Sequence, residues 1–82
     1  MKISVEISYY PLNVQYKPHI KDFIKRLTSH QSLVVNSNTM STQVFGEYAD
    51  VMQALAEEIH KSFELPHSVF VLKIINADLN KS

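Results

Sequence analysis

The sequence predicts a small α+β domain, and three observations carry that prediction. Two segments repeat apolar residues at the helical spacing of three to four positions. Four shorter segments are rich in the β-branched and aromatic residues that favour strands. These segments follow one another in the order strand, helix, strand, strand, helix, strand. The chain has 82 residues, of which 45% are hydrophobic, so we expect a single globular domain over residues 1–82.

The first strand and the first helix differ in the period of their apolar residues. Ile3, Val5 and Ile7 alternate with polar residues, which predicts a strand with one covered face that ends at Pro11. The predicted helix has Pro18 in its first turn, where proline is tolerated because its missing N–H would have no helical partner. Its apolar stripe consists of Ile20, Phe23, Ile24 and Leu27.

The middle of the chain predicts two strands joined by a polar turn. We expect the strands over Leu33–Val35 and Met40–Phe45, because residues 36–38 (Asn-Ser-Asn) favour a turn through bonds to their own backbone. Gly46, the only glycine, ends the second of these strands. We expect it to supply a backbone angle that other residues resist.

The last helix and the last strand complete the topology of a known fold. The helix is expected over Tyr48–Phe63 and the strand over Val69–Ile75, followed by a polar tail from Ala77. Two helices this short cover only one face of a four-stranded antiparallel sheet. The order β-α-β-β-α-β therefore predicts a ferredoxin-like fold, with strand order 4-1-3-2 and both helices on one face.

The final strand suggests a partner for the sheet. In residues 69–75 both alternating sets are apolar apart from Lys73, a pattern that is expected when both faces of a strand are buried. The helices cover one set only. A second copy of the chain is the simplest cover for the other, and the alternative is a partly exposed apolar face.

Composition excludes several classes of function. Eight Lys and Arg residues balance eight Asp and Glu residues, so no net charge attracts nucleic acid or an anionic membrane. The absence of cysteine excludes disulfides, thiolate catalysis and cysteine-based metal sites. The N-terminal residues alternate too early for a signal peptide, and no segment is apolar over the length of a membrane span. We expect a cytoplasmic protein.

No residue pattern indicates catalysis or a metal site. The four histidines form no HxxH or HxxxH pair, and we expect ordinary surface or helix-end positions for His19, His30, His60 and His67. Glu57 and Glu58 are adjacent and look like solvated charges on the exposed side of a helix. We therefore expect a protein that is not an enzyme, with no catalytic residue, no metal and no cofactor.

Two polar groups are candidates for ligand binding. If Ile3, Val5 and Ile7 face the helices, Glu6 and Ser8 lie on the open face of the sheet, where they can contact a polar ligand. The alternative for Glu6 is a cross-strand ion pair with Lys73. The hinge segment, residues 38–42, offers short polar donors and acceptors that suit a heterocycle, and its alternative is turn chemistry. It consists of Asn38, Thr39, Met40, Ser41 and Thr42.

Segments spread over nearly the whole chain make the sequence resemble the YkoF-like thiamine-binding family. Within the hinge segment, Met40 and Thr42 match the family, whereas Asn38 stands where Thr is usual and Ser41 where Gly is usual. Glu6 and Ser8 match polar positions of its first strand. The segments that carry the resemblance are Val5–Leu12, Asn38–Thr42 with Gly46-Glu47, Asp50–Met52, Ile59-His60 and Leu72–Ile74.

The resemblance implies a ferredoxin-like fold, a homodimer or homotetramer, and non-catalytic binding of thiamine or its hydroxymethylpyrimidine moiety. Glu6, Ser8 and the hinge segment would hydrogen-bond the aminopyrimidine, and Tyr9, Tyr10 or Phe45 would stack on its ring. The alternative function is a structural or protein-interaction module that forms the same oligomer without a small-molecule ligand.

Overall fold

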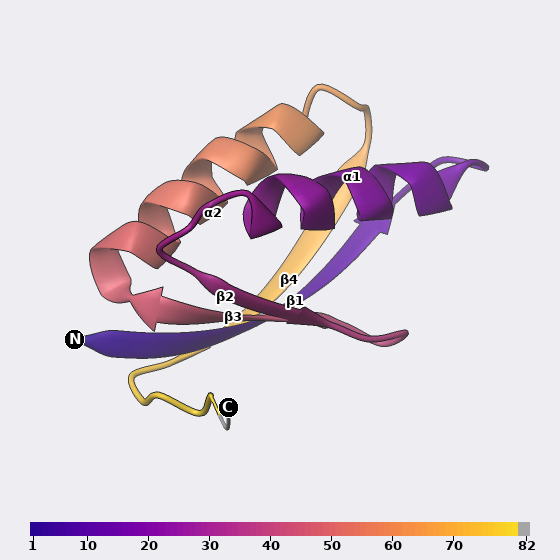
Figure 1. The fold of residues 1–82 in the computed structure, drawn as a ribbon. Helices are drawn as coiled ribbons and strands as arrows, with labels where there is room; N and C mark the ends of the chain where they lie inside the picture. Colours follow the sequence, from indigo (N-terminus) through magenta and orange to yellow (C-terminus); the bar gives the residue numbers. More distant parts are fainter. Residues whose placement is uncertain (81–82) are drawn as a thin grey trace.

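The computed structural model describes residues 1–80 and has the predicted order of elements. The predicted domain is thus described except for its last two residues, which lie outside this range. Both helices lie on one side of a twisted four-stranded sheet, and the tail after the last strand lies on the other side (Figure 1). The elements are β1 (Lys2–Pro11), α1 (Tyr16–Thr28), β2 (Val34–Ser37), β3 (Thr42–Glu47), α2 (Tyr48–Ser62) and β4 (Ser68–Ile75).

The sheet has the order β2-β3-β1-β4, and all neighbouring strands are antiparallel. This confirms the predicted ferredoxin-like order, because 4-1-3-2 is the same order read from the other edge. The predicted strand at Met40 begins two residues later, at Thr42. The side chain of Asn38 explains the delay, since its Oδ1 accepts hydrogen bonds from the main-chain N–H groups of Met40 and Ser41. Those residues therefore belong to the turn.

The core lies between the helices and the covered face of the sheet. β1 runs through its centre, and Ile3, Val5 and Ile7 are each at most 2% exposed. Phe23 of α1 packs edge-on against Tyr9 of β1, with 5.5 Å between the ring centroids. The predicted alternation of β1 and the apolar stripe of α1 thus meet in one hydrophobic cluster.

Gly46 lies inside β3, and its role differs from the prediction. Its φ is not positive, so the expectation of an unusual backbone angle is wrong. A Cβ at this position would lie 3.2 Å from side-chain carbons of Leu33 and Val51. Glycine is therefore placed here because β3 approaches the loop before β2 and the start of α2 too closely for a side chain.

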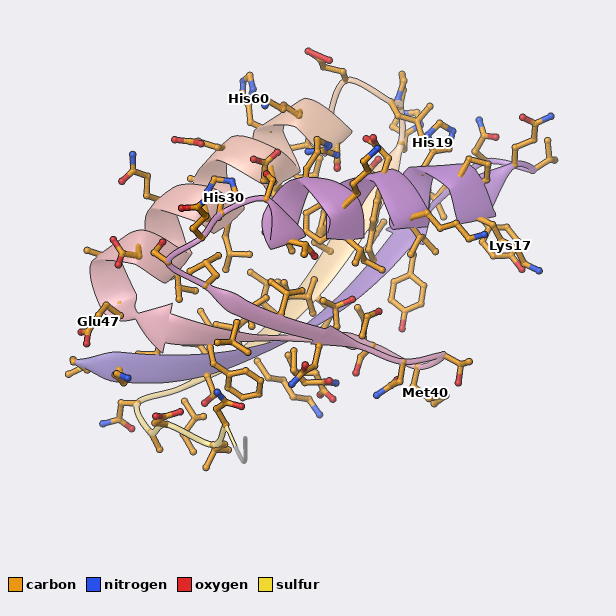
Figure 2. All side chains as sticks on the ribbon, viewed as in Figure 1. Lys17, His19, His30, Met40, Glu47 and His60 are labelled. Atoms are coloured by element: carbon orange, nitrogen blue, oxygen red, sulfur yellow. The ribbon has the colours of Figure 1, made fainter. Side chains whose placement is uncertain are left out.

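The expectation that Glu58 is a solvated charge is also wrong. Glu58 is 3% exposed and lies between the two helices. Arg26 Nη1 donates to its Oε1 at 2.8 Å, and the His30 ring nitrogen Nε2 lies 2.7 Å from its Oε2. His30 follows the end of α1 and lies beside α2 (Figure 2). His30 is consequently a half-buried partner rather than an ordinary surface residue. Its neighbour Glu57 is exposed, as predicted.

β4 is an edge strand that the helices cover less than its sequence suggested. Phe70 stacks on Tyr9 at a centroid distance of 4.2 Å, which anchors the start of the strand in the core. Further along, Ile74 on the helix side and Ile75 on the open side are 49% and 46% exposed. Within one chain, β4 therefore leaves apolar side chains uncovered on both faces.

Within residues 1–80, no helix combines the length and the apolar character needed to cross a membrane.

Candidate functional site

The open face of the sheet carries a hollow of about 470 Å³, which we name the open-face hollow. Its walls come from β1, β3 and β4 and from the tail that follows β4. Its volume lies within the range of roughly 300–1,000 Å³ that is typical of small-molecule sites. Residues that define it include Ser4, Glu6, Gln43, Phe45, Ile75 and Leu79.

Glu6 is the acidic group of this hollow, and one hydroxyl group, itself bonded by one amide group, holds it in place. The hydroxyl of Ser41 donates to Glu6 Oε2 at 3.0 Å. Gln43 Nε2 in turn donates to Ser41 Oγ at 2.8 Å. This short relay orients the carboxylate on a sheet strand, which is a more rigid support than a loop.

The predicted pairing of Glu6 with Lys73 is confirmed. The two residues are directly opposite in the antiparallel pair of β1 and β4, and Lys73 Nζ lies 3.6 Å from Glu6 Oε1. Their side chains are 44% and 80% exposed, so the pair contributes at most about 1 kcal/mol. A ligand can therefore displace Lys73 at little cost, which leaves the carboxylate available.

The rest of the hollow is apolar and is bordered by the tail. Phe45 and Ile75 are the direct neighbours of Ser4 on the two adjacent strands. Ser4 Oγ donates to the carbonyl of Ala77 at 2.7 Å and accepts from the N–H of Leu79 at 2.9 Å. These two bonds hold the tail against the open face, so Leu79 forms part of the wall.

The structure brings together only part of the predicted site. Ser41 of the hinge segment donates a hydrogen bond to Glu6. Ser8 of β1 lies on the open face but does not line the hollow. All five residues of the segment, Ser41 included, line a different hollow together with Tyr9 and Tyr10. Thr42 in particular turns to the helix side, where it is buried and lies opposite Ser37. The hinge segment therefore lies outside the open-face hollow and is connected to it through the hydrogen bond of Ser41 to Glu6.

Several residues of the open-face hollow were missed by sequence reasoning. Ser4, Gln43 and Leu79 had no predicted ligand role, and Phe45 had been considered only as one of three stacking rings. The signal that locates Gln43 and Phe45 is register, since Gln43 is directly opposite Glu6 and Phe45 is directly opposite Ser4. The position of Leu79 depends on how the tail folds back, which no periodicity reveals.

A second polar cluster lies between the helices and serves the fold. His30, Glu57 and Glu58 place potential metal-ligating atoms within 4.8 Å of one another. Both oxygens of Glu58 are bonded within the chain, one to Arg26 and the other to His30. Glu58 is therefore the centre of a buried ion-pair network, whereas Glu57 is exposed.

The network also shifts the acidity of its members. Burial by itself raises the pKa of Glu58, but the hydrogen bonds from His30 and Arg26 and the charge of Lys61 outweigh burial. The pKa of Glu58 therefore lies below its ordinary value. The charged form of Arg26 is stabilised as well. Desolvation by itself lowers the pKa of Arg26, but its hydrogen bonds to Glu58 and Asp22 outweigh desolvation and raise that pKa.

Solved structures of three proteins share this architecture. The hypothetical protein MJ1052 from Methanocaldococcus jannascii has a TM-score of 0.81 and 23% identity, over 98% of this chain and 84% of its own. A protein from Thermotoga maritima, TM0486, provisionally named for thiamine biosynthesis/salvage, has a TM-score of 0.81 and 20% identity, over 94% of this chain and 85% of its own. Protein SP2199 from Streptococcus pneumoniae has a TM-score of 0.80 and 18% identity, over 96% and 90%.

These likenesses establish the ferredoxin-like fold. The chain matches no protein-family model. No curated protein matches it in sequence.

Proposed function

We propose that the open-face hollow binds thiamine or a related aminopyrimidine, and that the protein does so as a cytoplasmic homo-oligomer without catalysis. The observation that carries this proposal is a carboxylate, Glu6, held by Ser41 inside a hollow whose wall includes the aromatic ring of Phe45. A fixed acceptor beside an aromatic wall is the combination that recognises a flat ring bearing an amino group.

The chemistry of thiamine suits this arrangement in two ways. Its aminopyrimidine ring carries an exocyclic amino group, which donates hydrogen bonds to a carboxylate such as that of Glu6. Its thiazolium ring is a cation, and a carboxylate stabilises a cation that replaces the weakly held ammonium of Lys73. Phe45 offers an aromatic face to either ring.

Two further observations support the proposal. One of the solved structures with this fold is the Thermotoga maritima protein provisionally named for thiamine biosynthesis/salvage. The segments of this chain that resemble the YkoF-like family include both Glu6, which lines the open-face hollow, and Ser41, which donates a hydrogen bond to Glu6.

A second copy of the chain completes the site in this proposal. The open face of β4 leaves Val71 and Ile75 about half exposed beside the hollow. Burial of such side chains against another subunit contributes roughly 25 cal/mol per Å² of apolar surface. A homodimer or homotetramer that stacks open faces would remove the hollow from bulk water, which strengthens each polar contact inside it.

Isothermal titration calorimetry with thiamine and with hydroxymethylpyrimidine tests the proposal. For a ligand of about 18 heavy atoms, a contribution of about 0.3 kcal/mol per atom corresponds to a Kd on the order of 0.1 mM. Glu6→Gln should weaken thiamine binding at least tenfold, which is about 1.4 kcal/mol, while the fold is retained. Glu57→Gln is the matched control, because Glu57 is an exposed glutamate on α2 and lies outside the hollow.

The alternative function is an assembly module without a small-molecule ligand. The observation that favours it is β4, whose apolar side chains are uncovered on both faces within one chain. The same titration separates the two functions. No heat and no change in Tm with either compound at millimolar concentration, in a protein that still forms oligomers, would establish the assembly module and contradict the ligand proposal.

A further inference from the structure

The chain turns back onto the open face of the sheet after β4. It bends at residues 76 and 77, and residues 76–80, which we name the strap, lie on the side of the sheet opposite the helices (Figure 1). One side chain holds the strap there. Ser4 Oγ donates to the carbonyl of Ala77 at 2.7 Å and accepts from the N–H of Leu79 at 2.9 Å. The donor and an acceptor site of a single hydroxyl are therefore both used to hold the strap.

Ser4 differs from the residues that follow it on the open face of β1. Glu6 and Ser8 are half-buried there. Ser4, in contrast, is 6% exposed, although the helices cover the other face of the strand. The strap supplies this cover together with the cross-strand neighbours Phe45 and Ile75. One end of the open face is thus already occupied by the chain itself.

The strap lies in space that a second copy of the chain needs. In the proposed oligomer two open faces stack, and stacked sheets lie about 10 Å apart with side chains from both sheets filling the layer between them. Because main-chain groups of the strap bond directly to Ser4, the backbone of the strap lies within this layer. A second sheet therefore cannot reach its packing distance over Ser4 while the strap stays in place.

The strap also carries a charge into this layer. Asp78 is exposed, and its Oδ1 accepts a hydrogen bond from the N–H of Asn80 at 3.1 Å. A sheet stacked over the strap would remove this carboxylate from water, which is unfavourable unless the charge is paired. At the other end of β4 the open face presents Val69 and Val71, which are 43% and 50% exposed. Stacking is favoured at that end and opposed at the end that holds the strap.

We propose that the strap is an autoinhibitory contact, which competes with a second copy of the chain for the open face and is latched by Ser4. While the strap is closed, Leu79 forms part of the wall of the open-face hollow. When two chains stack, the strap leaves Ser4 and side chains of the second copy replace Leu79 in that wall. The inference rests on the open-face stacking of the proposed function, to which it adds a segment that opposes stacking.

Sedimentation velocity over a concentration series of the intact chain tests the competition. Ser4→Ala removes both hydrogen bonds and no core side chain, and it should weaken closure of one strap by roughly tenfold. Because two straps open when two chains stack, the Kd of self-association should fall by roughly a hundredfold. Leu79→Pro acts from the other side of the latch, since proline has no N–H, and should shift the Kd in the same direction by a smaller factor.

Ser8→Ala is the matched control, because Ser8 is the same residue type on the same strand and the same face, and the latch does not involve it. It should leave the Kd of self-association nearly unchanged. If the wild type associates and the Ser4→Ala and Leu79→Pro variants associate equally or more weakly, the strap is overturned and self-association stands. If the wild type and all variants stay monomeric at high concentration, both are overturned, and thiamine binding is decided separately by calorimetry.

Amide hydrogen exchange at Leu79 gives a second readout. In dilute wild-type protein the N–H of Leu79 is bonded to Ser4 and should exchange more slowly than in Ser4→Ala. As the concentration rises and chains associate, this exchange should become faster, because the strap is released. Exchange that becomes slower on association would show that the strap belongs to the interface, and would contradict the competition.

Discussion

The two faces of the sheet use similar strands in different ways. On the helix-covered face, Val5 and Val44 are almost completely buried within one chain. On the open face, the same strands present Glu6 and Phe45 beside a hollow, and β4 adds half-exposed apolar side chains. The covered face is therefore complete as a core, whereas the open face leaves apolar side chains and a hollow exposed within one chain.

The largest expected effect lies on the covered side. Leu27 of α1 is 0% exposed, and Leu27→Ala should lower the free energy of unfolding by about 3–4 kcal/mol through lost burial and an unfilled cavity. Urea denaturation of the variant measures this loss. Ile75→Ala on the open face is the comparison, and in the monomer it should cost less than about 1 kcal/mol. Equal losses would contradict the difference between the two faces.

The next effect concerns the polar network between the helices. Glu58→Ala leaves Arg26 without its buried carboxylate and should cost about 2–3 kcal/mol in the free energy of unfolding. Glu57→Ala, the adjacent exposed position, should change it by no more than about 0.5 kcal/mol. A neutral Glu58→Ala variant in urea denaturation would show that the network does not stabilise the helix pair.

The same network predicts a dependence of stability on pH. Because the folded state lowers the pKa of Glu58 below the ordinary value of 4.5, the unfolded chain binds this proton more readily. The contribution of Glu58 is therefore fully present well above pH 4.5 and is lost as the pH falls through the lowered folded pKa. The difference in Tm between the wild type and Glu58→Ala should shrink as the pH is lowered from 7 towards 3. A difference that grows in acid would contradict the assignment.

A substitution in β4 is expected to have the smallest effect on the stability of a single chain. The same substitution should have the most specific effect on assembly. Val71→Asp places a charge on the open face, where Val71 is 50% exposed, so the monomer should tolerate it while self-association is lost. Sedimentation velocity measures the change in oligomeric state. Val14→Asp is the control, because Val14 is 96% exposed in the loop before α1. A wild-type chain that is monomeric at high concentration would contradict self-association directly.

The covered face was more predictable from the sequence than the open one. Alternation in β1 fixes which residues face the helices, and the same alternation places Glu6 opposite Lys73 once the strand order is known. The burial of Glu58 was not predictable locally, because its partners Arg26 and His30 come from 32 and 28 positions earlier in the chain. The separation of the hinge segment from the open-face hollow was not predictable either, because all five of its residues line the hollow beside Tyr9 and Tyr10, and only the hydroxyl of Ser41 reaches Glu6.

Amide chemical-shift mapping of the isotope-labelled protein during a thiamine titration tests the central claim most directly. We predict saturable shifts at residues of the open-face hollow, including Glu6, Gln43 and Phe45, with little change at the hinge residues Thr39 and Met40. The Glu6→Gln variant should show the same shifts only at much higher thiamine concentration. Shifts confined to the hinge segment and to the hollow beside Tyr9 and Tyr10, or no saturable shift at millimolar thiamine, would contradict the claim that Glu6 organises a thiamine site.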